Sequence, residues 1–306
     1  MTQDSVFPHP NLEELERVLL GISSNEKPVP LAERFRALFS LKALKTEQAV
    51  HIVAKAFRDD SALLKHEVAY VLGQMKNPAA LPCLETVLRK LDEDPMVRHE
   101  AAEAMGAIGD KSSLPILTEF LQDDSPDVSQ TCELAIEKIE FDSNEAASGV
   151  KNSIYQSIDP APPAFEDLPV AELKKILLDE TLPLFKRYRA MFGLRNKNTS
   201  ESVLALAEGL DDSSALFRHE IAFIFGQMQH PASVPALIKS LSKEGEAAMV
   251  RHESAEALGS IATPEVLEVL KKFSKDPEQV VRESCIVALD MYEYENSDQF
   301  QYAHVV

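Results

Sequence analysis

A short motif in which a histidine precedes a glutamate occurs four times in this sequence, and it constrains the fold more than any other feature. Within each half of the chain the two copies lie 33 residues apart, and 153 residues separate corresponding copies in the two halves. The copies are Leu64-Lys65-His66-Glu67, Val97-Arg98-His99-Glu100, Phe217-Arg218-His219-Glu220 and Val250-Arg251-His252-Glu253. A motif that recurs at a fixed period of about 20–50 residues indicates a chain built from structural repeats.

Each repeat is predicted to contain two helices, because its apolar residues recur at the three- and four-residue spacing of a helix face. The helices predicted for the first half are roughly 11–21, 31–44, 47–57, 61–75, 80–91, 95–108, 114–121 and 126–139. Capping residues followed by proline, at Asp94-Pro95, Ser125-Pro126 and Asp276-Pro277, predict helix starts. One helix pair alone would leave an apolar face in water, so the pairs must stack into an all-α solenoid.

The second half repeats the first without a gap over a long span. A shift of 153 residues carries Arg34 onto Arg187, Cys132 onto Cys285 and the triplet beginning at Gly73 onto the one beginning at Gly226. We therefore predict two pseudo-symmetric halves of four repeats each, residues 1–140 and 166–306, with eight helix pairs in all. Residues 141–165 are rich in Ser, Asn, Asp, Ala and Pro, which predicts an exposed, flexible linker.

Composition excludes several functions. The net charge is −19 and no basic face is apparent, so we expect no nucleic-acid partner. No apolar run approaches the length of about 18 residues that would indicate a membrane span, and no signal peptide is apparent at the N-terminus. The three cysteines are an odd number and lie in apolar helical patterns, which favours reduced, buried thiols in the cytoplasm.

The histidine pairs are predicted to bind metal. Each lies near the start of the second helix of its repeat, and such helices run side by side about 8–10 Å apart. His66 and His99, and likewise His219 and His252, could therefore approach a shared ion. A histidine and the next residue project about 100° apart around a helix, so we expect the carboxylate to come from the other half. Two histidines and one carboxylate with open positions suit non-haem Fe(II).

Four glutamates are candidate carboxylate ligands, and the residues alone do not choose between the pair Glu67 and Glu220 and the pair Glu100 and Glu253. Glu103 and Glu256 lie four residues after His99 and His252, where they could orient those rings. Simple copying of surface residues does not explain the motif, because only the two middle repeats of each half carry it. A zinc-protease helix is excluded, since no copy has a second histidine four residues after the first.

Duplicated repeats with four His-Glu pairs resemble the deoxyhypusine hydroxylases. The resemblance covers roughly residues 12–294, with all four motifs intact. It implies a HEAT-like α-solenoid and a di-iron monooxygenase with two Fe(II) ions, O₂ as co-substrate and an external reductant. The implied reaction hydroxylates the deoxyhypusine side chain of eukaryotic translation initiation factor 5A to hypusine. The net negative charge fits a substrate that carries cationic amines.

The resemblance also implies roles for the glutamates, with Glu67 and Glu220 as iron ligands and Glu100 and Glu253 facing the substrate amines. We expect a monomer located in the cytoplasm and also in the nucleus. Two alternatives from other classes stay open, a non-catalytic HEAT-repeat scaffold that binds a protein partner and a relative of the phycobilin lyases. Metal analysis would separate the hydroxylase from the scaffold, and nothing in the function of a phycobilin lyase calls for four symmetric His-Glu pairs.

Overall fold

The computed structural model describes residues 11–23, 27–144, 155–164 and 167–297, and within them the only regular elements are helices. The first half contains α1 (Leu12–Leu19), α2 (Leu31–Leu44), α3 (Glu47–Ala54), η1 (Lys55–Arg58), α4 (Ala62–Met75), η2 (Pro78–Ala80), α5 (Leu81–Arg89), α6 (Pro95–Ile108), η3 (Lys111–Ser113), α7 (Leu114–Glu119), η4 (Phe120–Gln122) and α8 (Pro126–Ser143). The second half contains α9 (Val170–Leu178), α10 (Leu184–Lys197), α11 (Ser200–Ala207), η6 (Glu208–Asp211), α12 (Ala215–Met228), η7 (Pro231–Ser233), α13 (Val234–Ser242), α14 (Ala248–Ile261), α15 (Val266–Phe273) and α16 (Gln279–Glu295). The predicted all-α solenoid of eight helix pairs is confirmed.

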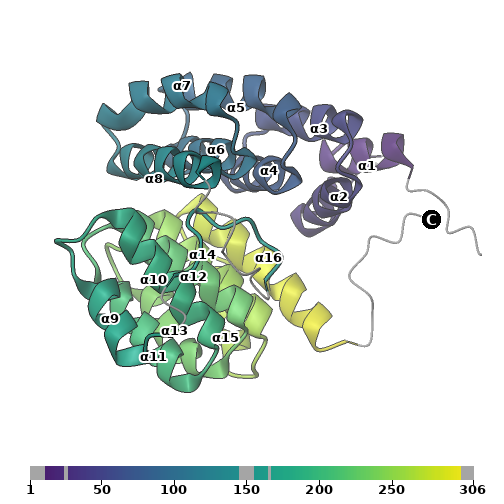
Figure 1. The fold of residues 1–306 in the computed structure, drawn as a ribbon. Helices are drawn as coiled ribbons and strands as arrows, with labels where there is room; N and C mark the ends of the chain where they lie inside the picture. Colours follow the sequence, from purple (N-terminus) through teal and green to yellow (C-terminus); the bar gives the residue numbers. More distant parts are fainter. Residues whose placement is uncertain (1–10, 24–26, 145–154, 165–166, 298–306) are drawn as a thin grey trace, which may run out of the picture.

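The two halves lie one above the other, with α1–α8 in one layer and α9–α16 in the other (Figure 1). Helices α4, α6 and α8 line the side of the first half that faces the second, whereas α3, α5 and α7 lie on its outer side. Each half has its own apolar core, but the cores interlock. Val287 of α16 packs in the core of the first half, and Met96 and Leu134 pack in that of the second.

Glycines allow the inner helices to approach closely. A Cβ added at Gly73 of α4 would lie 2.8 Å from the Cα of Ala104 in α6, and one at Gly259 of α14 would lie 2.7 Å from the Cα of Ala288 in α16. A side chain at either position would therefore force the helices apart. This close packing holds α4 against α6, the helices that carry His66 and His99.

The basic residue that precedes each motif histidine has a structural role. It forms an ion pair with an acidic residue in the loop that leads to the second helix of the next repeat. The four pairs are Lys65 with Glu93, Arg98 with Asp123, Arg218 with Glu246, and Arg251 with Asp276. The side chains of Arg98 and Asp123 are each only 5% exposed, so this is a buried pair. The repeats are thus joined by ion pairs as well as by apolar packing.

Two of the three predicted prolines begin their helices, but only one of them follows a residue whose side chain caps the helix. Asp94 caps α6 by accepting a hydrogen bond from the backbone N–H of Met96 at 2.9 Å. Helix α8 begins at Pro126, but the side chain of Ser125 makes no capping hydrogen bond. Helix α16 begins at Gln279, after Asp276-Pro277, because the carboxylate of Asp276 folds the preceding turn and binds Arg251.

The prediction that residues 141–165 form an exposed linker is wrong for its described parts. Helix α8 continues to Ser143, and in the segment 155–164 the side chains of Asp159, Ala161 and Ala164 are buried. The amide of Gln74 in α4 hydrogen-bonds both backbone groups of Ile158, accepting at 2.9 Å and donating at 3.1 Å. Charge pairing and amide contacts bury this segment despite its polar, proline-rich composition.

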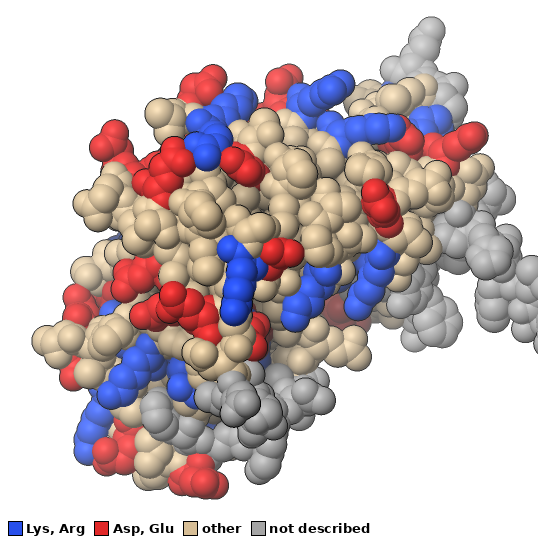
Figure 2. Space-filling view, turned by 45° about the horizontal axis from the view of Figure 1, so that its top comes forward, with Lys and Arg blue, Asp and Glu red and all other residues tan. Residues whose placement is uncertain are grey.

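The halves are also joined by polar contacts to α16. Arg36 of α2 forms an ion pair with Asp290 of α16, and Ser61 donates a hydrogen bond to Glu283 of α16 at 2.7 Å. None of the helices in the described ranges is both long and apolar enough to cross a membrane. On the face drawn in Figure 2, basic and acidic side chains are interspersed, so this face carries no continuous basic patch.

Candidate metal centre

The four motif histidines converge between the two halves. They come from the first two turns of α4, α6, α12 and α14. The rings of His66 and His99 lie 5.6 Å apart between centroids, and those of His219 and His252 lie 5.4 Å apart. Across the halves, His66 lies 5.7 Å from His219 and 5.1 Å from His252. The predicted pairs therefore form one cluster of four imidazoles.

One glutamate from each half points into this cluster. The Oε2 of Glu100 lies 3.3 Å from Nε2 of His66, and the Oε2 of Glu253 lies 3.5 Å from Nε2 of His219. Ligand atoms of His66, His99 and Glu100 all fall within 4.8 Å of one another. The expectation that each carboxylate comes from the opposite half is therefore wrong. A glutamate has three side-chain dihedral angles, which let it bend back toward the histidine pair of its own half.

We call Glu100 and Glu253 the α6/α14 glutamates, and Glu67 and Glu220 the α4/α12 glutamates. Of the α4/α12 glutamates, Glu67 has its Oε1 3.4 Å from Nδ1 of His66, whereas Glu100 approaches the other nitrogen of that ring. No ion pair joins Glu220 to a histidine among the described residues. The geometry thus favours the α6/α14 glutamates as ligands, the reverse of what the family resemblance implies.

The imidazoles are buried without hydrogen-bond partners. His66, His99, His219 and His252 are at most 5% exposed, and none of their eight ring nitrogens is hydrogen-bonded within the described residues. Buried polar atoms in native proteins nearly always have a partner, and an unsatisfied one costs about 1–3 kcal/mol. Each neutral ring has one nitrogen with a free lone pair, so the cluster offers four such nitrogens to metal ions, and ligation would satisfy them.

The protonation of the imidazoles also fits metal binding. Burial lowers the pKa of His99, His219 and His252 well below the ordinary value, and neighbouring histidines lower it further. These three rings are therefore neutral, which is the form that binds metals. Burial would likewise lower the pKa of His66, but the nearby carboxylates of Glu100 and Glu67 raise it well above the ordinary value.

Too few cationic groups lie near the carboxylates of the cluster to keep their pKa values at the ordinary level. Burial and the charges of neighbouring acids raise the pKa of Glu220 and Glu256 to about 8. The pKa of Glu103 and Glu253 is also raised, by burial first and then by neighbouring carboxylates. A divalent cation would favour their ionised forms. The donor set therefore fits one or more metal ions.

Of the two glutamates predicted to orient the histidine rings, Glu256 has a carboxylate oxygen within 4.8 Å of ligand atoms of His252 and Glu253. The Oε1 of Glu256 lies 3.8 Å from Nδ1 of His252, which is too far for a hydrogen bond. Glu103 is partly buried on α6, and its charge interacts with those of Glu100 and Glu220. Their predicted role in orienting His99 and His252 stays a prediction.

Comparison with known proteins identifies the family. The chain matches the HEAT-repeat family model over residues 49–137 and 171–290. It is 53% identical over 291 residues to the Drosophila pseudoobscura pseudoobscura protein named deoxyhypusine hydroxylase, with 95% of each chain covered. The Candida albicans protein of that name is 55% identical over 309 residues, covering 96% of each. The solved structure of human deoxyhypusine hydroxylase in complex with glycerol superposes with a TM-score of 0.87 at 50% identity, covering 92% of this chain and 97% of that one. This chain belongs to the deoxyhypusine hydroxylase family.

Membership in the deoxyhypusine hydroxylase family confirms the resemblance drawn from the four motifs. It also disfavours the scaffold and phycobilin-lyase alternatives, because the relatives match over nearly the whole chain and share one name. Human deoxyhypusine hydroxylase is a third such relative, 53% identical over 293 residues.

Sequence reasoning missed two aromatic residues beside the histidines. Tyr70 of α4 and Phe223 of α12 stack edge to face across the halves, with ring centroids 5.8 Å apart. Each lies one turn after a motif histidine, and the two positions are related by the shift of 153 residues. That symmetry was a usable signal, because residues near a pseudo-two-fold axis must meet their own counterparts.

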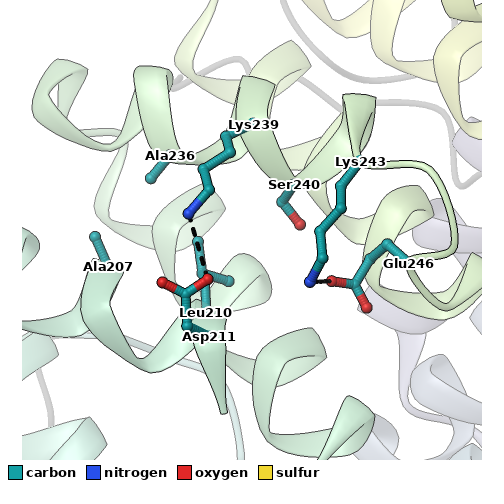
Figure 3. A pocket seen from close by; sticks show the side chains of 8 residues that line it. All are labelled: Ala207, Leu210, Asp211, Ala236, Lys239, Ser240, Lys243 and Glu246. Carbon is teal, nitrogen blue, oxygen red and sulfur yellow. Dashed lines mark hydrogen bonds and ion pairs between the residues drawn. The ribbon is translucent and has the colours of Figure 1, made fainter. Parts of the chain in front are cut away.

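A surface pocket between α11, η6 and α13 is lined by other residues (Figure 3). Its two lysines point toward acidic partners, with Lys239 lying 3.3 Å from Asp211 and Lys243 lying 2.9 Å from Glu246. Both charges are thus already neutralised, and we assign the pocket no role in the chemistry.

Proposed function

We propose that this chain is a deoxyhypusine monooxygenase that hydroxylates the deoxyhypusine side chain of translation initiation factor 5A to hypusine. The observation that carries the proposal is the cluster of four buried imidazoles without hydrogen-bond partners, in a chain more than half identical to proteins named deoxyhypusine hydroxylase. A scaffold would gain nothing from eight unsatisfied buried nitrogens.

In this proposal the cluster holds two iron ions. His66, His99 and Glu100 would hold one, and His219, His252 and Glu253 the other. Two histidines and one carboxylate leave positions open on each ion, which is the arrangement of non-haem iron oxygenases. When bound, the iron centre would supply activation of O₂, with electrons from an external reductant.

The remaining residues bind and enclose the substrate side chain. The α4/α12 glutamates would accept hydrogen bonds from the substrate's ammonium groups, because their carboxylates are buried and have few cationic partners. Tyr70 and Phe223 form an apolar wall one turn below the histidines and exclude water there. The segment 155–164 closes the site beyond this wall through its contacts with Gln74.

Metal and product analysis test this function. Protein purified under anaerobic and aerobic conditions should contain two irons per chain. With O₂ and a reductant, it should add one oxygen atom to deoxyhypusine-containing initiation factor 5A, as measured by mass spectrometry. The proposal fails if the protein contains only zinc or no metal, or if the iron-loaded protein leaves the substrate mass unchanged.

We propose further that the protein acts as a monomer in the cytoplasm and has no nucleic-acid or membrane partner. All the residues of the site come from one chain, so no second copy is needed to complete it. Cys83, Cys132 and Cys285 are free thiols, which suits a reducing compartment. Light scattering of the iron-loaded protein should return the mass of one chain.

A further inference from the structure

The pseudo-symmetry of the chain predicts two equivalent approaches to the histidine cluster, one beside α10 and one beside α2. These helices correspond under the shift of 153 residues, so Phe39 matches Phe192 and Lys42 matches Arg195. A single chain has only one segment between its halves. That segment can cover only one of the two approaches.

The segment 155–164 covers the approach beside α10. The guanidinium of Arg195 donates hydrogen bonds to Asp159 at 2.9 and 2.6 Å and lies over the rings of Tyr155 and Phe192. Both Arg195 and Phe192 have no exposed surface. Gly193 lets the backbone come close, since a Cβ there would lie 2.7 Å from the carbonyl oxygen of Ala164.

The approach beside α2 has no such cover among the described residues. Phe39 is 40% exposed, whereas its counterpart is fully buried. Lys42 forms no ion pair within the described part of the chain, and its ammonium lies 5.1 Å from the Phe39 ring centroid and 5.4 Å from that of Tyr70. Ser40 stands where α10 has Gly193, so a backbone cannot pack here in the same way.

The residues of this approach are connected to the histidine cluster through Tyr70. Tyr70 lies one turn after His66 on α4, and its ring also contacts Phe223 of the opposite half. The buried carboxylate of Glu67 lies close enough to act on the charge of Lys42. A cation that passes the rings of Phe39 and Tyr70 would therefore meet a carboxylate next to a histidine of the cluster.

We propose that the surface formed by Phe39, Lys42 and Tyr70, here the α2 entrance, admits the substrate side chain and recognises it as an alkylammonium chain. The proposal rests on the proposed function. The ammonium of Lys42 already lies near the rings of Phe39 and Tyr70. Its position shows that this surface accepts an alkylammonium group. Aromatic faces attract such cations through their negative π-electron density. Lys42 gives way when the substrate amine enters, because both cations compete for the same rings and carboxylate.

Site-directed labelling tests the α2 entrance. The native thiols interfere little, because Cys132 and Cys285 are buried and burial raises the pKa of each to about 12, while that of Cys83 is raised to about 11. The Phe39→Cys variant is treated with a bulky maleimide, with and without deoxyhypusine-containing initiation factor 5A. The matched control is Leu204→Cys, at a residue 58% exposed on the outer helix α11.

The substrate should slow labelling of Phe39→Cys at least tenfold and leave Leu204→Cys unaffected. The label on Phe39→Cys should reduce turnover at least tenfold without changing the iron content. In a second measurement, Lys42→Met should lower KM severalfold at unchanged kcat, since the competing ammonium is gone. Equal labelling rates with and without substrate, or full turnover after labelling, would overturn the α2 entrance. Absence of turnover in the unlabelled, iron-loaded protein with Phe39 intact would instead contradict the proposed function.

Discussion

Replacement of Asp159 with asparagine tests whether the segment 155–164 holds the two halves together. The carboxylate pairs with Arg195, and the two side chains are 7% and 0% exposed. The variant leaves a buried guanidinium without its counter-charge, and breaking a buried ion pair in this way costs roughly 3–5 kcal/mol. Each kcal/mol lowers Tm by about 2–4 °C in chains of 150–250 residues. Metal-free protein should therefore melt roughly 10 °C lower, as followed by circular dichroism.

The ion pair between Arg36 and Asp290 provides the matched control. It also joins the two halves, but its side chains are 36% and 33% exposed, so Asp290→Asn should cost only about 0–1 kcal/mol. The double variant Arg195→Met with Asp159→Leu should recover part of the loss, because it leaves no unpaired buried charge. Equal melting temperatures for Asp159→Asn and Asp290→Asn would refute the reasoning.

Three further predictions concern the metal centre and the ion pairs between repeats. Alanine at either α6/α14 glutamate should lower the iron content to about one ion per chain or less, because each of these residues serves one ion. Alanine at either α4/α12 glutamate should keep the iron and weaken substrate binding roughly 10- to 100-fold, the equivalent of about 1.5–3 kcal/mol; iron analysis and substrate titration distinguish the two. Removal of iron with a chelator should lower the Tm, since the metal binds only the folded chain, and an unchanged Tm would contradict ligation by the histidine cluster. Burial would raise the pKa of Asp123, but its hydrogen bonds from Arg98 lower it below the ordinary value. The stabilisation of the fold by this ion pair is therefore complete above about pH 4 and is lost as the pH falls through the lowered pKa. Asp123→Asn should thus make the melting temperature less sensitive to acid.

The helices were predictable because their signals are local and repeated. The predicted ranges 31–44 and 95–108 coincide with α2 and α6; both have a helix-spaced apolar pattern, and α6 also has the capping residue Asp94. The convergence of the histidines was predictable as well, since equal positions in adjacent repeats must lie side by side. Symmetry then brought the two pairs together across the halves.

The side-chain directions of the glutamates and the burial of the linker were not predictable. A glutamate follows every motif histidine, but only the observed rotamers bring Glu100 toward the ring of its own half. The linker composition is typical of a solvated segment, and nothing local marks Asp159 as buried. Its burial depends on Arg195, which lies 36 residues away and pairs with it only once the second half has folded.

Duplication and covalent continuity together explain how a symmetric metal centre can have one-sided access. Two copies of a four-repeat unit place equivalent ligands on both sides of the histidine cluster, which suits two equivalent ions. The chain that connects the copies cannot obey the same symmetry, because it leaves one half only once and enters the other only once. Its buried part lies against Arg195 and Phe192, and their counterparts Lys42 and Phe39 remain uncovered by it. If the proposed di-iron function holds, a substrate side chain would therefore reach both ions from one direction without any change in the ligands themselves.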